Sequence, residues 1–470
     1  MKVSLKFAAR RMGLGLLFGV ASCPAWGQTT AVFQNGLNGY NGTVDRVISD
    51  LGTGTGDERD LSTVASQFLD GYQADGTDAN TLPDSRDDQL LIRFDNIIGN
   101  GPGQIPSGAT ILDAKLTFVT SLAGNAQTNG PFGVAGLVDP FDQNTSYFTN
   151  YSSDTNWGSR GPWWQDGSAT RPVGGFGFQL QGGTDSASVA PLVQNWANGM
   201  PNHGMVVQAG LSDFQAINSE GVPTDSAANT ADGWSIQTTG YPIADGRPKL
   251  EVTYTTEPIA VRTFQRGDTN GYASDTMAWV RSGPNVLTFD TGEETHDGLG
   301  LQEAFLDGAN ITLPDGTTNS PDDLALLKFG DVFGSGANQV ATDVPVAKAW
   351  VVLTTGDDVN ATTGNSTAHS SGPWAAHAVL RDWDTTTLHS DLGETAGLQV
   401  ADGDISSALD VQTGMIRGAE VWFDVTSYLE GVRTGAEDYG IAIMAAGTAD
   451  GWAIHFNGSD EAESRPRLVV

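Results

Sequence analysis

Aromatic side chains without a repeated counterpart are the residues of this sequence best suited to hold a ligand. Planar apolar rings stack on the faces of sugar rings, and they are otherwise costly to leave in water. Trp350 and Trp422 fall at strand positions that alternate with core residues and so point outward. Trp157, Trp163 and Trp164 fall in a loop rich in Gly, Ser and Asp. These five tryptophans are candidate ligand platforms; the favoured interpretation is that a second sheet or the other half of the chain packs over them.

Three cations stand beside expected core residues. Arg93 in LLIRFDNIIGNG and Lys328 in ALLKFGDVFGSG each precede a phenylalanine and point to the opposite face of the strand. Lys115 alternates with Ala114 and Leu116, so it also points away from the core. These cations are candidates to meet a carboxylate of a ligand. Pairing with an aspartate of the chain itself is the common alternative in so acidic a sequence.

Carboxylates recur at corresponding places and suit a hard cation. Loop carboxylates and carbonyls are the ligands that calcium prefers, so a structural calcium ion is one interpretation. Aspartate is also an ordinary turn residue, which is the favoured interpretation. The weak metal candidates are Asp70, Asp87 and Asp88 and their counterparts Asp307, Asp322 and Asp323.

Signatures of known catalytic sites are missing from the sequence. It contains no GxSxG elbow, no HExxH zinc helix and no Walker loop. A carboxylate pair for glycoside hydrolysis stays open, because the required separation of the two groups is invisible in a sequence. We therefore predict a protein that is not an enzyme.

The charge of the chain limits its partners. With 23 Lys and Arg against 56 Asp and Glu, the net charge is −33. Such a chain repels nucleic acid and anionic membrane surfaces. An anionic polymer would bind only where a local basic patch or a bound cation offsets this charge.

The N-terminal segment predicts export. Basic residues between Lys2 and Arg11 precede the apolar run MGLGLLFGVA and a small-residue exit, which is the layout of a bacterial secretory signal over residues 1–27. The expected product is secreted, extracellular or at the cell surface. In the alternative, Cys23 in VASC is acylated and retained as a lipoprotein anchor. Cys23 is the only cysteine, so the mature chain forms no disulfide, and no segment reaches the length of a transmembrane helix.

The rest of the chain is a duplicated unit. FQNGLNGY at 33–40 returns as FQRGDTNGY at 264–272, and RPKLEV at 247–252 returns as RPRLVV at 465–470. The matching phrases keep their order, and units this long are domains rather than solenoid repeats. We expect a first copy over residues 28–256 and a second copy over residues 257–470.

Period-two alternation and abundant turn residues predict short strands joined by loops. Each copy has one plausible short helix, at PLVQNWANG and at TSYLEGVRTG. The expected fold class is all-β, with two tandem β-sandwich (jelly-roll-like) domains, each with at most one short helix. The aromatics that recur in both copies are expected in the cores: Phe33 and Phe264, Tyr40 and Tyr272, Phe94 and Phe329, and Trp234 and Trp452.

These phrases resemble a known family. LLIRFDNI with QIPSGATILDAKLTF, LVDPFDQNTSY, VAPLVQNWANGMPNHGMVV and RPKLEVTYT look like the DNRLRE-type domains of secreted bacterial and archaeal proteins. Those domains are similar to carbohydrate-binding modules found on alginate-degrading enzymes. The resemblance covers nearly the whole mature chain twice. It implies a jelly-roll-like fold and a role in carbohydrate binding or adhesion at the cell exterior, beside a separate catalytic partner.

Three functions follow as hypotheses. The first is a secreted, non-catalytic tandem β-sandwich protein that binds polysaccharide or a cell-surface glycan by aromatic stacking. The second is a structural or adhesive surface or matrix protein, whose aromatics lie in an interface and which self-associates. The third and least favoured is a polysaccharide lyase or hydrolase working between the copies.

Overall fold

A computed structural model gives the fold of the chain. It describes residues 27–49, 59–69, 88–124, 126, 130–142, 150–152, 155–156, 162, 167–177, 179–209, 233–268, 270–281, 294–301, 303–306, 323–356, 370–392, 397–446, 451–456 and 462–470. These residues form an all-β protein in which every pairing between named strands is antiparallel. Most of the expected leader lies outside the described residues. No described helix is long and apolar enough to span a membrane.

The first copy is built from a four-stranded and a six-stranded sheet, extended by a two-stranded pair. The four-stranded sheet has the order β1 (Gln28–Gln34), β14 (Lys249–Thr255), β6 (Thr110–Val119), β11 (Thr184–Ser188). The six-stranded sheet has the order β10 (Gly174–Phe176), β7 (Phe132–Gly136), β12 (Met205–Ala209), β5 (Asp88–Phe94), β2 (Thr43–Ser49), β3 (Arg59–Asp60). The pairs are β13 (Trp234–Gln237) with β4 (Ser66–Leu69), and a separate hairpin of β8 (Asn150–Ser152) with β9 (Thr155–Asn156).

The second copy repeats this strand order. Its four-stranded sheet is β15 (Thr263–Gln265), β26 (Arg467–Val469), β20 (Trp350–Thr354), β23 (Glu420–Asp424). Its six-stranded sheet is β22 (Asp410–Gln412), β21 (Trp374–Ala378), β24 (Ile441–Ala445), β19 (Asp323–Phe329), β16 (Asp275–Arg281), β17 (Glu294–Asp297). The additional pair is β18 (Glu303–Leu306) with β25 (Trp452–His455). The sequence duplication is therefore a duplication of sheet topology.

Each copy is a sandwich with its main core between the four-stranded and six-stranded sheets. Ala114 and Leu116 of β6 pack in the same cluster as Leu90 and Ile92 of β5, all with no exposed surface. The alternation expected for β6 is confirmed, since Lys115 between these core residues is exposed. The recurring aromatics also lie in or against the cores as expected.

The deepest recurring aromatics make the same contact in both copies. The indole Nε1 of Trp234 donates to Oγ1 of Thr120 at 2.9 Å, and that of Trp452 donates to Oγ1 of Thr355 at 3.1 Å. A buried indole N–H without a partner would lose the free energy of its hydration. The matched threonine hydroxyls therefore explain how each tryptophan can be fully buried in its core.

The one short helix predicted for each copy is present. Helix α1 (Ala190–Ala197) follows β11, and α2 (Thr426–Arg433) follows β23. Proline in the first turn of α1 costs no hydrogen bond, because that N–H has no partner inside a helix. Glycine follows each helix in the left-handed region, at Gly199 with φ 99° and Gly435 with φ 108°.

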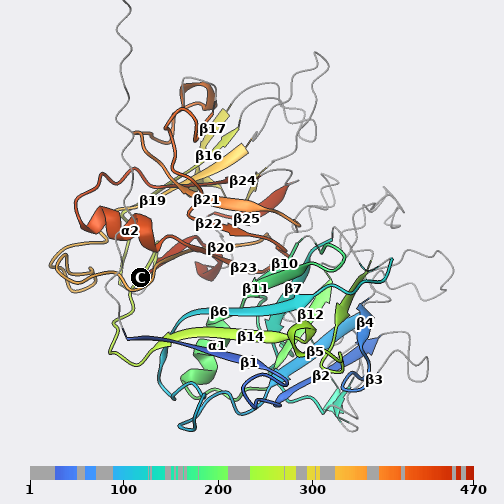
Figure 1. The fold of residues 1–470 in the computed structure, drawn as a ribbon. Helices are drawn as coiled ribbons and strands as arrows, with labels where there is room; N and C mark the ends of the chain where they lie inside the picture. The colour runs from blue at the N-terminus through green and yellow to red at the C-terminus, as the bar shows by residue number, and fades with distance from the viewer. Residues whose placement is uncertain are drawn as a thin grey trace, which may run out of the picture.

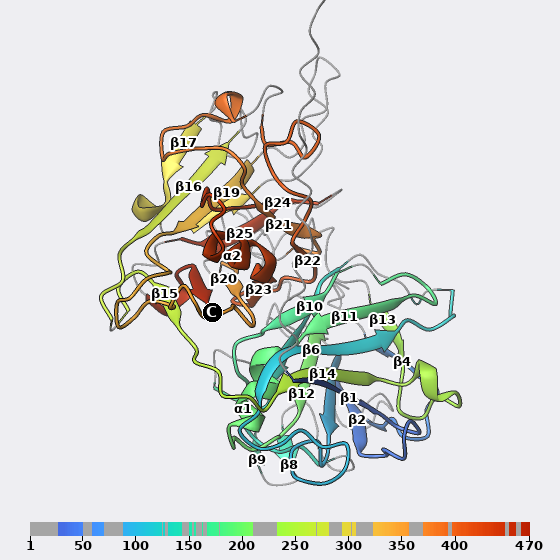
Figure 2. The same cartoon turned by 60° about the vertical axis from the view of Figure 1, so that its left-hand side comes forward.

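The two copies contact each other through backbone at one end of their interface. In Figures 1 and 2 the first copy, blue to green, lies below the second, yellow to red, and β10 approaches β22 and β23. The N–H of Glu420 donates to the carbonyl of Pro172 at 2.8 Å. A Cβ on Gly133 would lie 2.1 Å from Cδ1 of Ile416. Glycine at this position thus permits the close approach of the two copies.

Candidate functional site

A groove also lies between the two copies, and its lining shares no residue with the contact at Glu420 and Gly133. Its volume is about 480 Å³, within the roughly 300–1,000 Å³ common for ligand pockets. The first copy contributes the start of β6 and of α1, and the linker contributes residues 258–262. The second copy contributes residues 339–341 and 344–348, together with Trp350, Trp422 and the last two residues of the chain. The lining is mainly aliphatic, with two indoles.

Trp350 and Trp422 form the aromatic part of this groove. They lie on neighbouring strands, since Trp350 pairs with Asp424 and Trp422 pairs with Val352 in the β20–β23 ladder. Their rings meet edge to face, with centroids 5.8 Å apart and an interplanar angle of 79°. Both side chains are partly buried. The next residue along each strand, Val351 or Phe423, belongs to the core instead. The outward direction predicted for both tryptophans is confirmed.

A cation lies over each of these two rings. Nζ of Lys348 is 5.6 Å from the centroid of Trp350, and the guanidinium carbon of Arg467 is 5.3 Å from that of Trp422. Each cation also has a carboxylate: Lys348 pairs with Asp424, and Arg467 pairs with Glu420 at 2.7 Å. Such cation–π contacts orient an indole and fix which part of it faces outward.

The carboxylate of Asp424 is fully engaged. Its Oδ1 accepts the N–H of Thr426 at 2.9 Å and the hydroxyl of the same residue at 2.5 Å, which ties β23 to the start of α2. The N–H of Asp424 donates in turn to Oδ2 of Asp410 at 2.9 Å. Burial raises the pKa of Asp410, and the nearby charge of Asp424 adds to that rise. This network links β22 and β23 to the residues just before β20, on the same face as the tryptophans.

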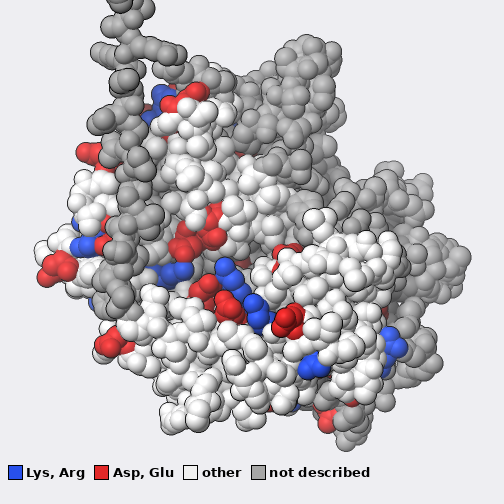
Figure 3. Space-filling model, viewed as in Figure 1, with Lys and Arg blue, Asp and Glu red and all other residues white. Residues whose placement is uncertain are grey.

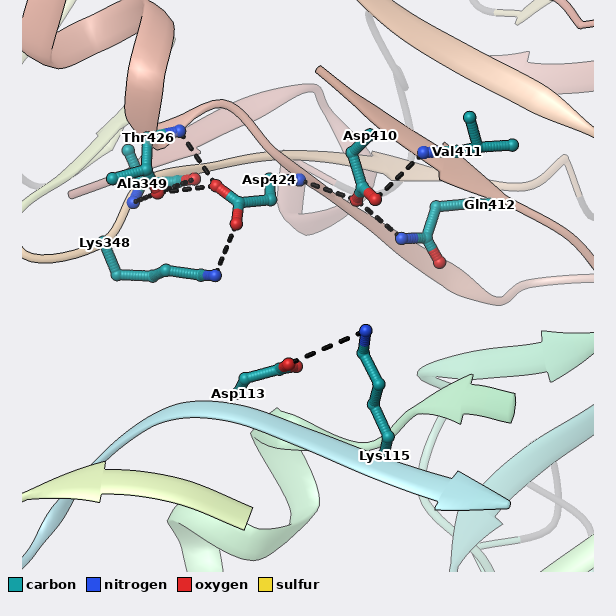
Figure 4. A network of polar contacts seen from close by, with 9 residues as sticks. All are labelled: Asp113, Lys115, Lys348, Ala349, Asp410, Val411, Gln412, Asp424 and Thr426. Carbon is teal, nitrogen blue, oxygen red and sulfur yellow. Dashed lines mark hydrogen bonds and ion pairs between the residues drawn. The ribbon is translucent and has the colours of Figure 1, made fainter. Parts of the chain in front are cut away.

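Polar side chains of the first copy face the second copy outside the cavity lining. Figure 4 shows Lys115 and Asp113 on β6, with the ammonium group of Lys115 directed toward the network around Asp424 and Asp410. Lys115 and Asp113 form a loose ion pair at 3.8 Å. Beside them, the hydroxyls of Thr117 and Ser186 bond to each other at 2.8 Å. Figure 3 shows Lys and Arg next to Asp and Glu where the two copies meet.

The three cations singled out in the sequence, Lys115, Arg93 and Lys328, do not line the groove. Arg93 pairs with Asp95 at 2.5 Å, donates to the carbonyl of Phe141 at 3.1 Å, and lies over that ring. This is the pairing within the chain that the sequence left open. Lys328 has no ion pair with another described residue, because Gly330 stands where the first copy has Asp95.

The carboxylates proposed for calcium fall into two groups. Four lie outside the described residues: Asp70, Asp87, Asp307 and Asp322. The other two begin β5 and β19 and are buried, and Asp323 lies 3.9 Å from the guanidinium of the buried Arg281. Within the described ranges, no three His, Cys, Asp or Glu residues are grouped to hold a metal ion. A structural calcium ion stays a prediction for which these residues give no support.

Three of the five candidate tryptophans, Trp157, Trp163 and Trp164, lie outside the described residues. By contrast, the structure adds charged residues in and beside the groove that the sequence reasoning missed: Lys348 lines it, and Glu420 and Asp424 lie next to its tryptophans. Lys348 lies two positions before Trp350, and Glu420 and Asp424 flank Trp422 at the same spacing. Extending the period-two alternation by one step on each strand would have placed all three on the outward face.

No family model matches the chain, and none of the curated proteins searched matches it. The resemblance to DNRLRE-type domains therefore stays a prediction that rests on the quoted phrases.

Proposed function

We propose that this chain is an exported, non-catalytic binding protein that holds a polysaccharide or cell-surface glycan in the groove between its two copies. The observation that carries the proposal is the pair Trp350 and Trp422, which point away from the core and line a cavity of about 480 Å³. Two indoles held at fixed orientation offer apolar faces to the C–H faces of sugar rings.

The opposite wall supports the same proposal. A sugar ring has apolar faces and a hydroxylated edge, so it needs both stacking surfaces and hydrogen-bonding groups. The groove has indoles on the second copy and the hydroxyl and amide side chains of Thr110 and Gln194 on the first. The groups that would bind a glycan thus come from both copies.

Affinity electrophoresis through gels containing single polysaccharides tests this function. We expect at least one polymer to retard the mature protein, and Trp350→Ala or Trp422→Ala to weaken that retardation by about tenfold in dissociation constant, since losing the apolar contact with one indole face costs on the order of 1.4 kcal/mol. Each substitution leaves the main core intact, because the two indoles lie outside it.

Trp279→Ala is the matched control. Trp279 is also partly buried and also has a cation over its ring, with the guanidinium carbon of Arg281 at 5.2 Å, but it lies outside the groove. Equal loss of retardation in Trp279→Ala and Trp422→Ala would show a general loss of stability. Absence of retardation by every polymer, together with self-association in light scattering, would favour a structural or matrix protein instead.

A further inference from the structure

We infer that the glycan bound in the groove is uncharged, so that the protein selects neutral polysaccharides and rejects polyuronates and sulfated polymers. This inference rests on the proposed function and names the chemical class of its ligand. It follows from how the charges around Trp350 and Trp422 are paired.

The cations next to the indoles are already neutralised within the second copy. Lys348 is bound to Asp424, and Arg467 is bound to Glu420 at 2.7 Å. Both cations are largely buried, with 19% and 14% of their side-chain surface exposed. An anionic sugar could use them only by displacing these carboxylates. Separating a partly buried ion pair leaves its other member without a partner, which is costly.

The other charges near the groove are few. Lys115 lies beside Asp113 at 3.8 Å on the facing strand of the first copy, outside the cavity lining. Two charged residues line the cavity itself: Lys348, which is bound to Asp424, and Arg262 of the linker, which donates to the carbonyl of Val261 at 3.1 Å. One guanidinium without an ion pair among the described residues does little to offset, for an approaching polyanion, the repulsion from the whole chain of net charge −33.

A neutral sugar needs none of these cations to be released. The ammonium and guanidinium groups approach the indole rings and stay with their carboxylates, while the rest of each ring lines the cavity. Stacking is an apolar contact, and hydrogen bonds to sugar hydroxyls involve no counterion release. Binding of a neutral chain should therefore depend little on salt, whereas binding through surface charges weakens as the Debye length shortens.

The test is affinity electrophoresis of the mature protein in hydroxyethylcellulose, galactomannan and mixed-linkage glucan on one side, and alginate, polygalacturonate and dextran sulfate on the other. We expect retardation by at least one neutral polymer and by none of the acidic ones, with the same retardation at about 50 and about 500 mM NaCl. Retardation by an acidic polymer but by no neutral one would overturn the inference and leave the proposed function standing. Retardation by no polymer at all would overturn both.

Glu420→Gln gives a second readout. It frees Arg467 from its carboxylate, while the amide oxygen can still accept the N–H of Trp422, now bound at 3.3 Å. We expect this variant to gain retardation in polygalacturonate that about 500 mM NaCl removes. Asp402→Asn, at an exposed turn outside the groove, changes the net charge equally and should gain nothing. Equal gains in both variants would contradict selection by local pairing.

Discussion

At the scale of single residues, the two copies differ most at the outward positions of two strands. Ladder register places Trp350 where the first copy has Lys115, and Trp422 where it has Ser186. The inward neighbours remain apolar in both copies. Because strand side chains alternate, the outer face can change from polar to aromatic without any change in the core. The second copy thus supplies the stacking surface, whereas the first keeps polar side chains at the corresponding positions.

A buried carboxylate in the first copy gives a prediction about pH. Asp45 has no exposed surface, and its carboxylate accepts the N–H and the hydroxyl of Thr239. Burial is the largest cause that raises the pKa of Asp45 from 3.8 to about 6. The folded state therefore binds this proton more tightly than the unfolded chain does. The contribution of Asp45 to stability is full below about pH 4 and is lost as the pH rises through about 6.

Asp45→Asn should remove this dependence. An asparagine can still accept the N–H of Thr239 and can donate to its hydroxyl oxygen. From pH 4 to pH 7 we expect the free energy of unfolding to shift in favour of the variant, relative to the parent, by on the order of 2 kcal/mol. Urea denaturation at both pH values measures the shift. The second copy has Met277 at the corresponding ladder position, so only the first copy should respond. Equal pH dependence in parent and variant would refute the assignment.

At the scale of elements, the edge of the first six-stranded sheet fixes how the copies meet. The edge strand β10 pairs with β7, and Gly133 of β7 faces Ile416 of the second copy so closely that a Cβ would lie 2.1 Å from its Cδ1. Strand edges are prone to unwanted pairing, and here the second copy covers this one. The contact is also what holds the tryptophans of β20 and β23 opposite β6.

Gly133→Val should loosen this contact without harming the first core, because the added side chain meets Ile416 first and strand geometry tolerates valine. The N–H of Glu420, bonded to the carbonyl of Pro172, reports the contact directly. We expect its hydrogen-exchange protection to fall by at least about tenfold. Adding Ile416→Ala removes the clash and should restore protection. Unchanged protection in Gly133→Val alone would show that the copies meet without needing glycine there.

At the scale of the whole molecule, the sequence predicted the fold better than the site. The all-β class, the short helices and the outward direction of Trp350 and Trp422 follow from local alternation and from internal repetition, which one chain displays by itself. The groove needs the relative placement of two sandwiches and a linker, and residues more than 70 positions apart, such as Lys348 and Trp422, line it together. Local patterns contain no such distances.

Filling the groove shows whether the ligand binds between the two copies. Ala260 and Ala341 are exposed residues that line the cavity from the linker and from the second copy. Changing both to leucine removes space while leaving Trp350 and Trp422 in place, and leucine adds no aromatic surface. The matched control changes Ala401 and Ala436, which are exposed and outside the groove, to leucine.

The measurement is retardation of both double variants by the polymer that binds the parent. We predict that the Ala260→Leu, Ala341→Leu protein loses retardation and that the Ala401→Leu, Ala436→Leu protein retains it. Full retardation of the groove-filled protein would place the binding site outside the groove.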